Sequence, residues 1–175
     1  MKTTARVLIT KKCNRNCEGC CNKDEEIMKD MQDLYSLNLP KQFKTICITG
    51  GEPMLDPKRV LRIVNNIRQY RKDIKIYLYT ALWDEMLHTI IDHIDGIHYT
   101  IHKGYSYSDL EDFYKYQDLA TLYREYKSFR VYIDNDYMQI IRRLKPWVFS
   151  RFEIKPWKDK CPLPENEVLF YYGGK

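Results

Sequence analysis

Two hydrophobic periodicities alternate along the chain. Short runs rich in β-branched and aromatic residues are separated by segments in which apolar residues recur every three or four positions. The runs predict six strands, at residues 5–10, 44–49, 74–79, 97–101, 129–133 and 151–156. Because strands and helical segments alternate strictly, the pattern predicts parallel strands joined by right-handed helical crossovers.

Five helical segments are predicted between these strands. The second begins with Asp56 and Pro57, an N-cap acid followed by a proline at the first helical position. Gly96 is expected to close the third, Ser108 to cap the fourth, and Pro146 to follow the fifth. Their apolar stripes are, in order, Ile27, Met31, Leu34 and Leu37 after Asp24; Val60, Val64, Ile67 and Tyr70; Met86, Leu87, Ile90, Ile91 and Ile94; Leu110, Phe113, Leu122 and Tyr126; and Met138, Ile141 and Leu144.

The chain length sets the number of strand–helix units. A total of 175 residues leaves about 29 for each of six units, close to the ~30 that a βαβ unit needs, so eight units do not fit. We therefore predict one α/β domain over residues 1–175, an open partial (β/α)6 barrel of the TIM type with a curved parallel sheet. Its core is expected at about 5–156, with an irregular C-terminal tail at 157–175. The first and sixth strands are expected to be open sheet edges.

Composition narrows the class of protein. Hydrophobic residues make up 44% and charged residues 30%, a globular balance, and the net charge of +5 is attributed to solvated helix faces rather than to a nucleic-acid partner. No apolar run approaches the roughly 20 residues that span a bilayer, and the N-terminus lacks a signal-peptide pattern. We therefore expect a cytoplasmic protein with no membrane partner. Thiols stay reduced there, so the six cysteines point to metal ligands or packing rather than disulfides.

Four of the six cysteines fall within TKKCNRNCEGCCNKD, at residues 10–24. Cys13, Cys17 and Cys20 are separated by three and two residues, with Cys21 directly behind, in a polar loop after the first predicted strand. Active sites of parallel α/β folds collect at this end of the sheet. A zinc site usually takes its ligands from two separated pairs, and no second pair follows, so zinc is the weaker alternative. An iron–sulfur cubane tolerates short, uneven ligand gaps, and three protein ligands leave its fourth iron open.

This cysteine spacing resembles the signature of the radical S-adenosylmethionine superfamily. The second predicted strand ends in ITGGEPML, which is similar to that superfamily's second motif at the expected place. The resemblance implies a 4Fe-4S cluster held by Cys13, Cys17 and Cys20, with S-adenosylmethionine bound to the remaining iron through its amino and carboxylate groups. Reductive cleavage of this cofactor yields methionine and a 5′-deoxyadenosyl radical that abstracts hydrogen from a substrate, a reaction of the oxidoreductase or lyase type.

The resemblance also implies contacts with S-adenosylmethionine. Gly50 and Gly51 lack Cβ atoms, so their backbone can approach the cofactor's amino group. Glu52 is expected near the methionine end, and Pro53 is expected to fix the turn. Three further candidates follow later strands, where loop solvation or helix capping is an equally good interpretation: Thr80 near methionine or ribose, His102, and Lys155 near adenine.

Two branches of the superfamily are similar to this chain. Gly19 stands where many members of the superfamily have an aromatic residue; CEGC followed by CNKD instead resembles the activating enzymes of anaerobic ribonucleotide reductase, which often carry glycine there. That similarity implies a glycyl radical formed on a large protein partner. GGEP is closer to the broader superfamily, including 7-carboxy-7-deazaguanine synthases, which implies radical modification of a nucleotide or another small molecule. Both need an electron donor such as flavodoxin or ferredoxin. A non-catalytic metal or iron–sulfur binding module is the alternative from another class, and GGEP disfavours it.

Overall fold

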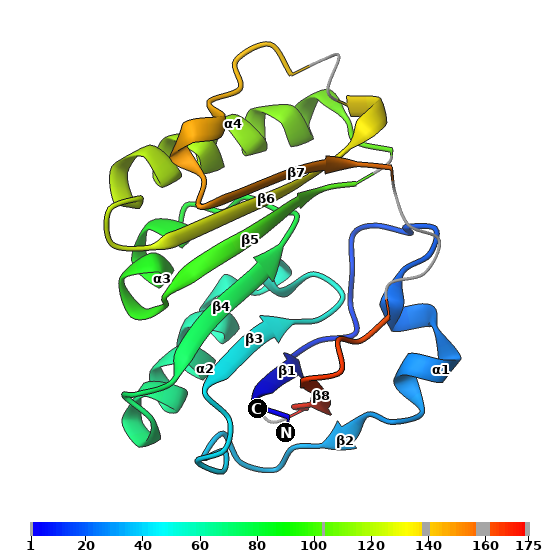
Figure 1. Cartoon of the computed structure of the whole chain (residues 1–175), viewed down its shortest axis with the longest axis vertical. Helices are drawn as coiled ribbons and strands as arrows, with labels where there is room; N and C mark the ends of the chain where they lie inside the picture. Colours follow the sequence, from blue (N-terminus) through cyan, green and yellow to red (C-terminus); the bar gives the residue numbers. More distant parts are fainter. Residues whose placement is uncertain (1, 103, 138–140, 157–161, 174–175) are drawn as a thin grey trace.

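The chain folds around one curved, open sheet in which every strand pair is parallel (Figure 1). The structure, a computed structural model, describes residues 2–102, 104–137, 141–156 and 162–173. In these residues the sheet has eight strands in the order β2-β8-β1-β3-β4-β5-β6-β7. The strands are β1 (Thr4–Leu8), β2 (Gln32–Asp33), β3 (Thr45–Thr49), β4 (Lys75–Thr80), β5 (Gly96–Ile101), β6 (Ser128–Asp134), β7 (Arg151–Lys155) and β8 (Glu167–Tyr171). This confirms the predicted α/β class and is consistent with a partial TIM-like barrel.

The six predicted strands are confirmed, with ends shifted by at most two residues, but two further strands extend the sheet beyond β1. β8 comes from the tail that was expected to be irregular, and it pairs with β1 from Thr4 opposite Glu167 onward. β2 pairs in turn with β8. The expected open edge at the first strand is therefore wrong, whereas β7 is an edge as predicted. Within the tail, residues 157–161 and 174–175 lie outside the described residues.

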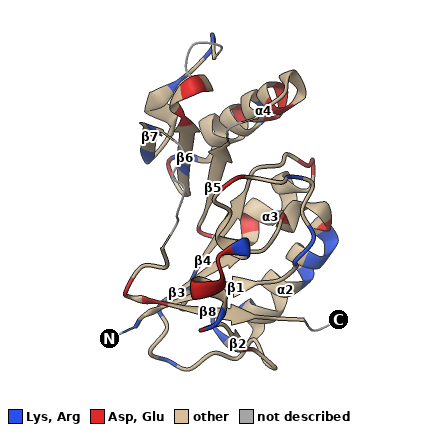
Figure 2. Cartoon of the chain, turned by 90° about the vertical axis from the view of Figure 1, so that its right-hand side faces the viewer, with Lys and Arg blue, Asp and Glu red and all other residues tan. Residues whose placement is uncertain are grey.

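Helices connect the strands, and three of them cover one face of the sheet. In Figure 2, α2, α3 and α4 lie on the same side of the strands. Among the described residues, none of the helices has the length and apolar character needed to cross a membrane. The helices are α1 (Glu25–Met28), α2 (Pro57–Tyr70), α3 (Leu87–His93) and α4 (Tyr107–Tyr123), with single 3-10 turns η1 (Cys21–Lys23), η2 (Pro53–Leu55), η3 (Asn135–Tyr137) and η4 (Pro146–Val148).

The start of α2 follows from local signals. The Asp56 carboxylate accepts a hydrogen bond from Arg59 N at 3.0 Å, and Pro57 occupies the first turn, so the helix begins where the sequence predicts. Its buried face consists of Val60, Ile63, Val64 and Ile67. Three residues of the predicted stripes are instead exposed, and all lie in or beyond the last turn of their helix: Tyr70 at 56%, Leu122 at 69% and Tyr126 at 84%.

Two of the predicted helices do not form as expected. The first is a single turn, since α1 ends at Met28 and the chain then enters β2, while Leu37 reaches the core from a loop. Its helical spacing is overridden because β8 offers β2 a strand partner and the core offers Leu37 a buried site. Of the predicted fifth helix, Met138 lies outside the described residues, residues 141–145 are not helical, and Pro146 begins η4.

Two predicted caps are also wrong. Gly96 does not close α3 but begins β5, where an added Cβ would lie 2.0 Å from Ser128 O on the neighbouring strand. The N-cap of α4 is Ser106 rather than Ser108. The reason is a capping box, in which the side chains of Ser106 and Asp109 each accept a hydrogen bond from the other residue's backbone N–H.

The two faces of the sheet differ in chemistry. Away from α2, α3 and α4, the sheet carries polar side chains: Arg6 Nε donates to Glu167 at 2.6 Å, and the ring centroids of Tyr79 and His98 lie 4.7 Å apart. Burial, together with the charges of Arg130 and Arg6, lowers the pKa of His98 to about 4. The helix-covered face forms the core, with Ile46, Ile48, Ile76, Leu78, Ile97, Tyr99, Ile101, Phe129, Val131 and Ile133.

Candidate functional site

The segment that carries the cysteines leaves the carboxyl end of β1 and is held against the turn after β3. Gly51 N donates to Thr10 O at 2.7 Å, and the next amide, Glu52 N, donates to Lys12 O at 2.8 Å. A Cβ added at Gly51 would lie 2.0 Å from Lys12 O. One added at Gly50 would lie 2.7 Å from Thr10 O. Both glycines are therefore required by the close approach of two backbones, and their contact with a cofactor stays a prediction.

The far end of the cysteine segment is anchored to the same turn. Asn22 Nδ2 donates to Gly50 O at 2.6 Å, so the segment is pinned on both sides of its thiols. Between the pins, Gly19 has a φ of 64°, in the left-handed region that favours glycine. The chain uses this conformation to turn between Cys17 and Cys20. Gly19 therefore has a local structural reason in this sequence, because a larger residue would be strained there.

Three thiols gather on this pinned segment. Cys13 is exposed, whereas Cys17, Cys20 and Cys21 are partly buried. Burial raises the pKa of Cys17, and the charges of Cys20 and Cys13 raise it further, so these three sulfurs lie close enough to interact. Among the described residues, no three Cys, His, Asp or Glu side chains are arranged to hold a single metal ion. Three neighbouring soft donors on one segment suit an iron–sulfur cluster, whose ligands need not converge on one ion.

Arg15, between the first two cysteines, ties the segment to distant parts of the chain. Its guanidinium forms an ion pair with Asp109 in the first turn of α4, and its Nη2 donates to Ala81 O at 3.2 Å. Its guanidinium carbon lies 4.4 Å from the ring centroid of Tyr105. The Arg15 side chain is only 13% exposed. Although burial opposes it, the hydrogen bond with Arg15 and those with Ser106 hold the pKa of Asp109 below its usual value.

Glu52 is buried at the centre of a second set of contacts. Only 3% of the residue is exposed, and its carboxylate accepts hydrogen bonds from Met54 N at 3.0 Å and Ala81 N at 2.8 Å. The Thr80 hydroxyl lies 2.6 Å from the same carboxylate. Burial raises the pKa of Glu52, although these hydrogen bonds act in the opposite direction. With Pro53 in the first position of η2, this arrangement joins the turn after β3 to the end of β4.

The last two predicted site residues lie on later strands. His102 follows β5, and burial, with the charge of Arg15 as the next contribution, lowers its pKa to about 4. Lys155 ends β7, which is five strands from β1 in the sheet order. Its ammonium pairs with Glu153 and lies 5.0 Å from the ring centroid of Tyr132. The structure thus brings the cysteine segment, the turn after β3 and the end of β4 together, whereas Lys155 lies on the edge strand β7.

Sequence reasoning missed several residues of this site. The contacts that fix the cysteine segment come from Arg15, Asn22, Tyr105 and Asp109. Of these, only Asp109 could have been predicted to have a structural role, because its spacing from Ser106 is that of a capping box. The Arg15–Asp109 pair joins residues 94 positions apart, and no local pattern announces such a contact.

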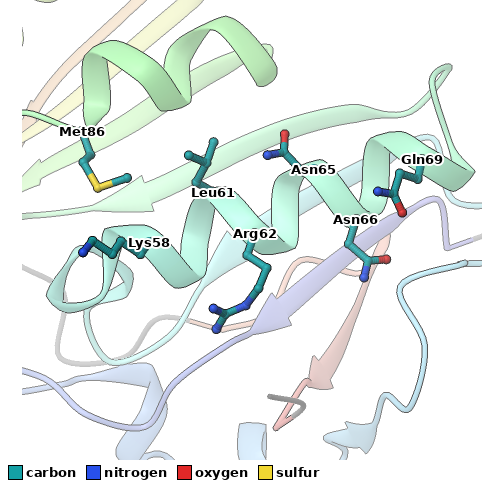
Figure 3. Close-up of a pocket in the computed structure, with 7 residues that line it drawn as sticks. All are labelled: Lys58, Leu61, Arg62, Asn65, Asn66, Gln69 and Met86. Carbon is teal, nitrogen blue, oxygen red and sulfur yellow. The ribbon is translucent and has the colours of Figure 1, made fainter.

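A pocket of about 400 Å³ lies elsewhere on the molecule. It is formed along the outer surface of α2 and beside the start of α3 (Figure 3). Its lining is mostly amide and basic, and none of the predicted site residues contributes to it. The lining residues are Lys58, Leu61, Arg62, Asn65, Asn66, Gln69 and Met86.

The fold and the site together define an α/β protein with a segment of closely spaced cysteines at the carboxyl end of a parallel sheet. A family model described as a 4Fe-4S single cluster domain matches residues 3–116, which is more than half of the chain. The chain belongs to this family. The matched part runs from β1 into α4, and it therefore contains the cysteine segment, the glycine turn and the Arg15–Asp109 pair. No curated protein matches the chain.

Proposed function

We propose that this protein is a radical S-adenosylmethionine enzyme in which Cys13, Cys17 and Cys20 bind the 4Fe-4S cluster. The observation that carries the proposal is the docking of the segment that contains the three neighbouring thiols onto the turn of Gly50 and Gly51, at the carboxyl end of the sheet. Three protein ligands leave one iron of a cubane available to another molecule. When bound, this cluster supplies the electron that cleaves S-adenosylmethionine into methionine and a 5′-deoxyadenosyl radical.

The residues of the chain have separate parts in this proposal. The turn of Gly50, Gly51, Glu52 and Pro53 borders the methionine end of S-adenosylmethionine, with the Glu52 carboxylate held in place by its three hydrogen-bond partners. Thr80 lies against that carboxylate and orients it. His102 is uncharged at neutral pH, because its pKa is about 4, so it offers the cofactor a hydrogen bond rather than a charge.

The radical needs a hydrogen donor, for which we propose a glycine of a large protein partner. The similarity of CEGC to the activating enzymes of anaerobic ribonucleotide reductase supports this substrate, and so does the position of α2, α3 and α4 on one face of the sheet, which leaves the polar face free of these helices (Figure 2). Flavodoxin or ferredoxin is the proposed electron donor. A nucleotide or other small-molecule substrate would require the same cluster, and product analysis separates the two.

The test is anaerobic reconstitution with iron and sulfide, followed by reduction and measurement of 5′-deoxyadenosine from added S-adenosylmethionine. We expect the wild-type protein to form it, and Cys17→Ala to abolish both cluster and product. Cys47→Ala is the matched control, because Cys47 is a buried thiol in β3 outside the cysteine segment, and it should keep both.

Two results would contradict this proposal. A reconstituted, reduced wild-type protein that leaves S-adenosylmethionine intact would make the chain a non-catalytic iron–sulfur module. Binding of one divalent ion by the three thiols, detected by metal analysis and X-ray absorption, would instead support the zinc alternative.

A further inference from the structure

We propose that Arg15 is a positioning residue, which holds the segment between Cys13 and Cys17 in the shape that receives the cluster. This inference rests on the cysteine ligands of the proposed function, but it does not depend on cleavage of S-adenosylmethionine. Arg15 achieves this by joining the cysteine segment to two rigid elements, the first turn of α4 and the end of β4.

The contacts of the guanidinium reach in three directions. Nη2 and Nη1 both bond the Asp109 carboxylate, the latter at 3.4 Å, and Nη2 also donates to Ala81 O. The ring of Tyr105 lies against the guanidinium, and its hydroxyl donates to the same Ala81 carbonyl at 3.2 Å. Asp109 is itself fixed by the capping box with Ser106. A planar, forked cation is needed to make these contacts together, which a lysine cannot do.

The segment between the two pins also has local contacts, because Lys23 Nζ donates to the Asn16 side chain and to Cys17 O, the latter at 3.5 Å. Arg15 N donates to Cys13 Sγ at 3.4 Å, so the residue also touches the first thiol through its backbone. Arg15 Nε is buried without a hydrogen-bond partner among the described residues. Because most buried polar groups in proteins are hydrogen-bonded, this atom is an exception within an otherwise well-bonded guanidinium.

The ion pair of Arg68 and Asp95 provides a control that distinguishes positioning of the cysteine segment from general stabilisation of the fold. Arg68 in α2 forms an ion pair with Asp95 at 2.7 Å and donates to Ile74 O at 2.6 Å. Like Arg15, it is a largely buried arginine that links a helix to the sheet, with 25% of its side chain exposed. It lies outside the cysteine segment. Arg68→Met should therefore weaken the fold without changing how the cluster is held.

The experiment measures iron release from reconstituted protein to a chelator in the absence of S-adenosylmethionine, together with the electron paramagnetic resonance spectrum of the reduced cluster. Arg15→Met should release iron about tenfold faster than wild type, in line with the loss of one charge-assisted hydrogen bond, and its spectrum should broaden as the ligands become heterogeneous. Asp109→Asn should change both readouts in the same direction. Arg15→Lys keeps the charge but not the fork, so it should resemble Arg15→Met.

The measurements on these variants test the role of Arg15 separately from the proposed function. Wild-type release rates and spectra in Arg15→Met and Asp109→Asn would overturn it, and so would equal acceleration in Arg68→Met. Full rescue by Arg15→Lys would show that charge alone matters and would also overturn it. If Arg15→Met does not fold, Asp109→Asn and Arg15→Lys still decide. A wild-type protein that takes up no cluster removes both proposals, whereas one that binds a cluster but leaves S-adenosylmethionine intact removes only the proposed function.

Discussion

Replacing Gly51 by alanine tests the packing of the cysteine segment most directly. The added Cβ would lie 2.0 Å from Lys12 O and 2.5 Å from the Lys12 carbonyl carbon, and real Cβ atoms keep at least 3.0 Å from such atoms. The two backbones must therefore separate by at least 1.0 Å. Both neighbours are main-chain atoms, so no side-chain rotation relieves the clash. Since Lys12 directly precedes Cys13, the displacement enters the ligand segment itself.

The expected cost follows from the contacts that are lost. Separation breaks two short backbone hydrogen bonds, from Gly51 N to Thr10 O and from Glu52 N to Lys12 O. With overpacking, we expect Gly51→Ala to lower the free energy of unfolding by about 3 kcal/mol. For a chain of this length that corresponds to a fall in Tm of about 6–12 °C. Urea and thermal unfolding of the cluster-free protein measure both quantities.

The second readout is iron and sulfide content after anaerobic reconstitution, which should fall well below wild type in Gly51→Ala. Gly104→Ala is the matched control, because Gly104 has a φ of 87° but no atom within 4 Å of an added Cβ. Its cost is backbone strain of about 1–2 kcal/mol, without movement of the cysteine segment. Gly51→Ala protein with wild-type stability and iron content would refute the close approach of the two backbones.

Three further predictions concern single side chains. Cys21→Ser should keep wild-type iron content, and loss of the cluster would make Cys21 a ligand. Glu52→Gln replaces one of the two acceptor oxygens by an amide nitrogen, so Ala81 N loses its hydrogen-bond partner. The free energy of unfolding of the cluster-free protein in urea should therefore fall by about 2 kcal/mol, and unchanged stability would contradict this. His98 has a folded pKa of about 4, below its unfolded value of about 6.5, so its contribution is complete above pH 6.5 and declines as the pH falls toward 4. When the pH is lowered from 7.5 to 5, the free energy of unfolding of His98→Gln should therefore fall by about 2 kcal/mol less than that of wild type. Parallel curves of unfolding free energy against pH for the two proteins would show that His98 does not titrate this way.

Elements of the fold that depend on neighbouring residues could be predicted from the sequence, whereas strand pairs between distant residues could not. The six predicted strands and the start of α2 at Asp56 and Pro57 depend on neighbouring residues, and they were read correctly. β8 was missed because its five residues follow a proline-rich stretch, and the strand it pairs with lies at the other end of the chain. The long first helix was wrong for a related reason, since β2 exists only because β8 offers it a partner.

In the candidate site, too, the local motifs could be predicted, whereas the contacts between distant residues could not. The thiol spacing and the glycine turn are local patterns, and the family match to residues 3–116 agrees with the cluster they predicted. The contacts of Arg15 could not be predicted, because Asp109 and Tyr105 reach it only after α4 packs against the sheet. The purpose of Gly51 was read incompletely for the same reason, since its closest neighbour is the backbone of Lys12.

By itself, the sequence determined the alternation of strands and helices, the start of α2 at Asp56 and Pro57, and the presence of three closely spaced thiols. Those features depend on side-chain periodicity, capping groups and spacing within a few residues. Only the tertiary structure decided which strands flank β1, how the cysteine segment is pinned, and which distant carboxylate holds Arg15. Such contacts form between residues far apart in the chain when the sheet assembles, and a local sequence pattern does not predict which of these residues will contact each other.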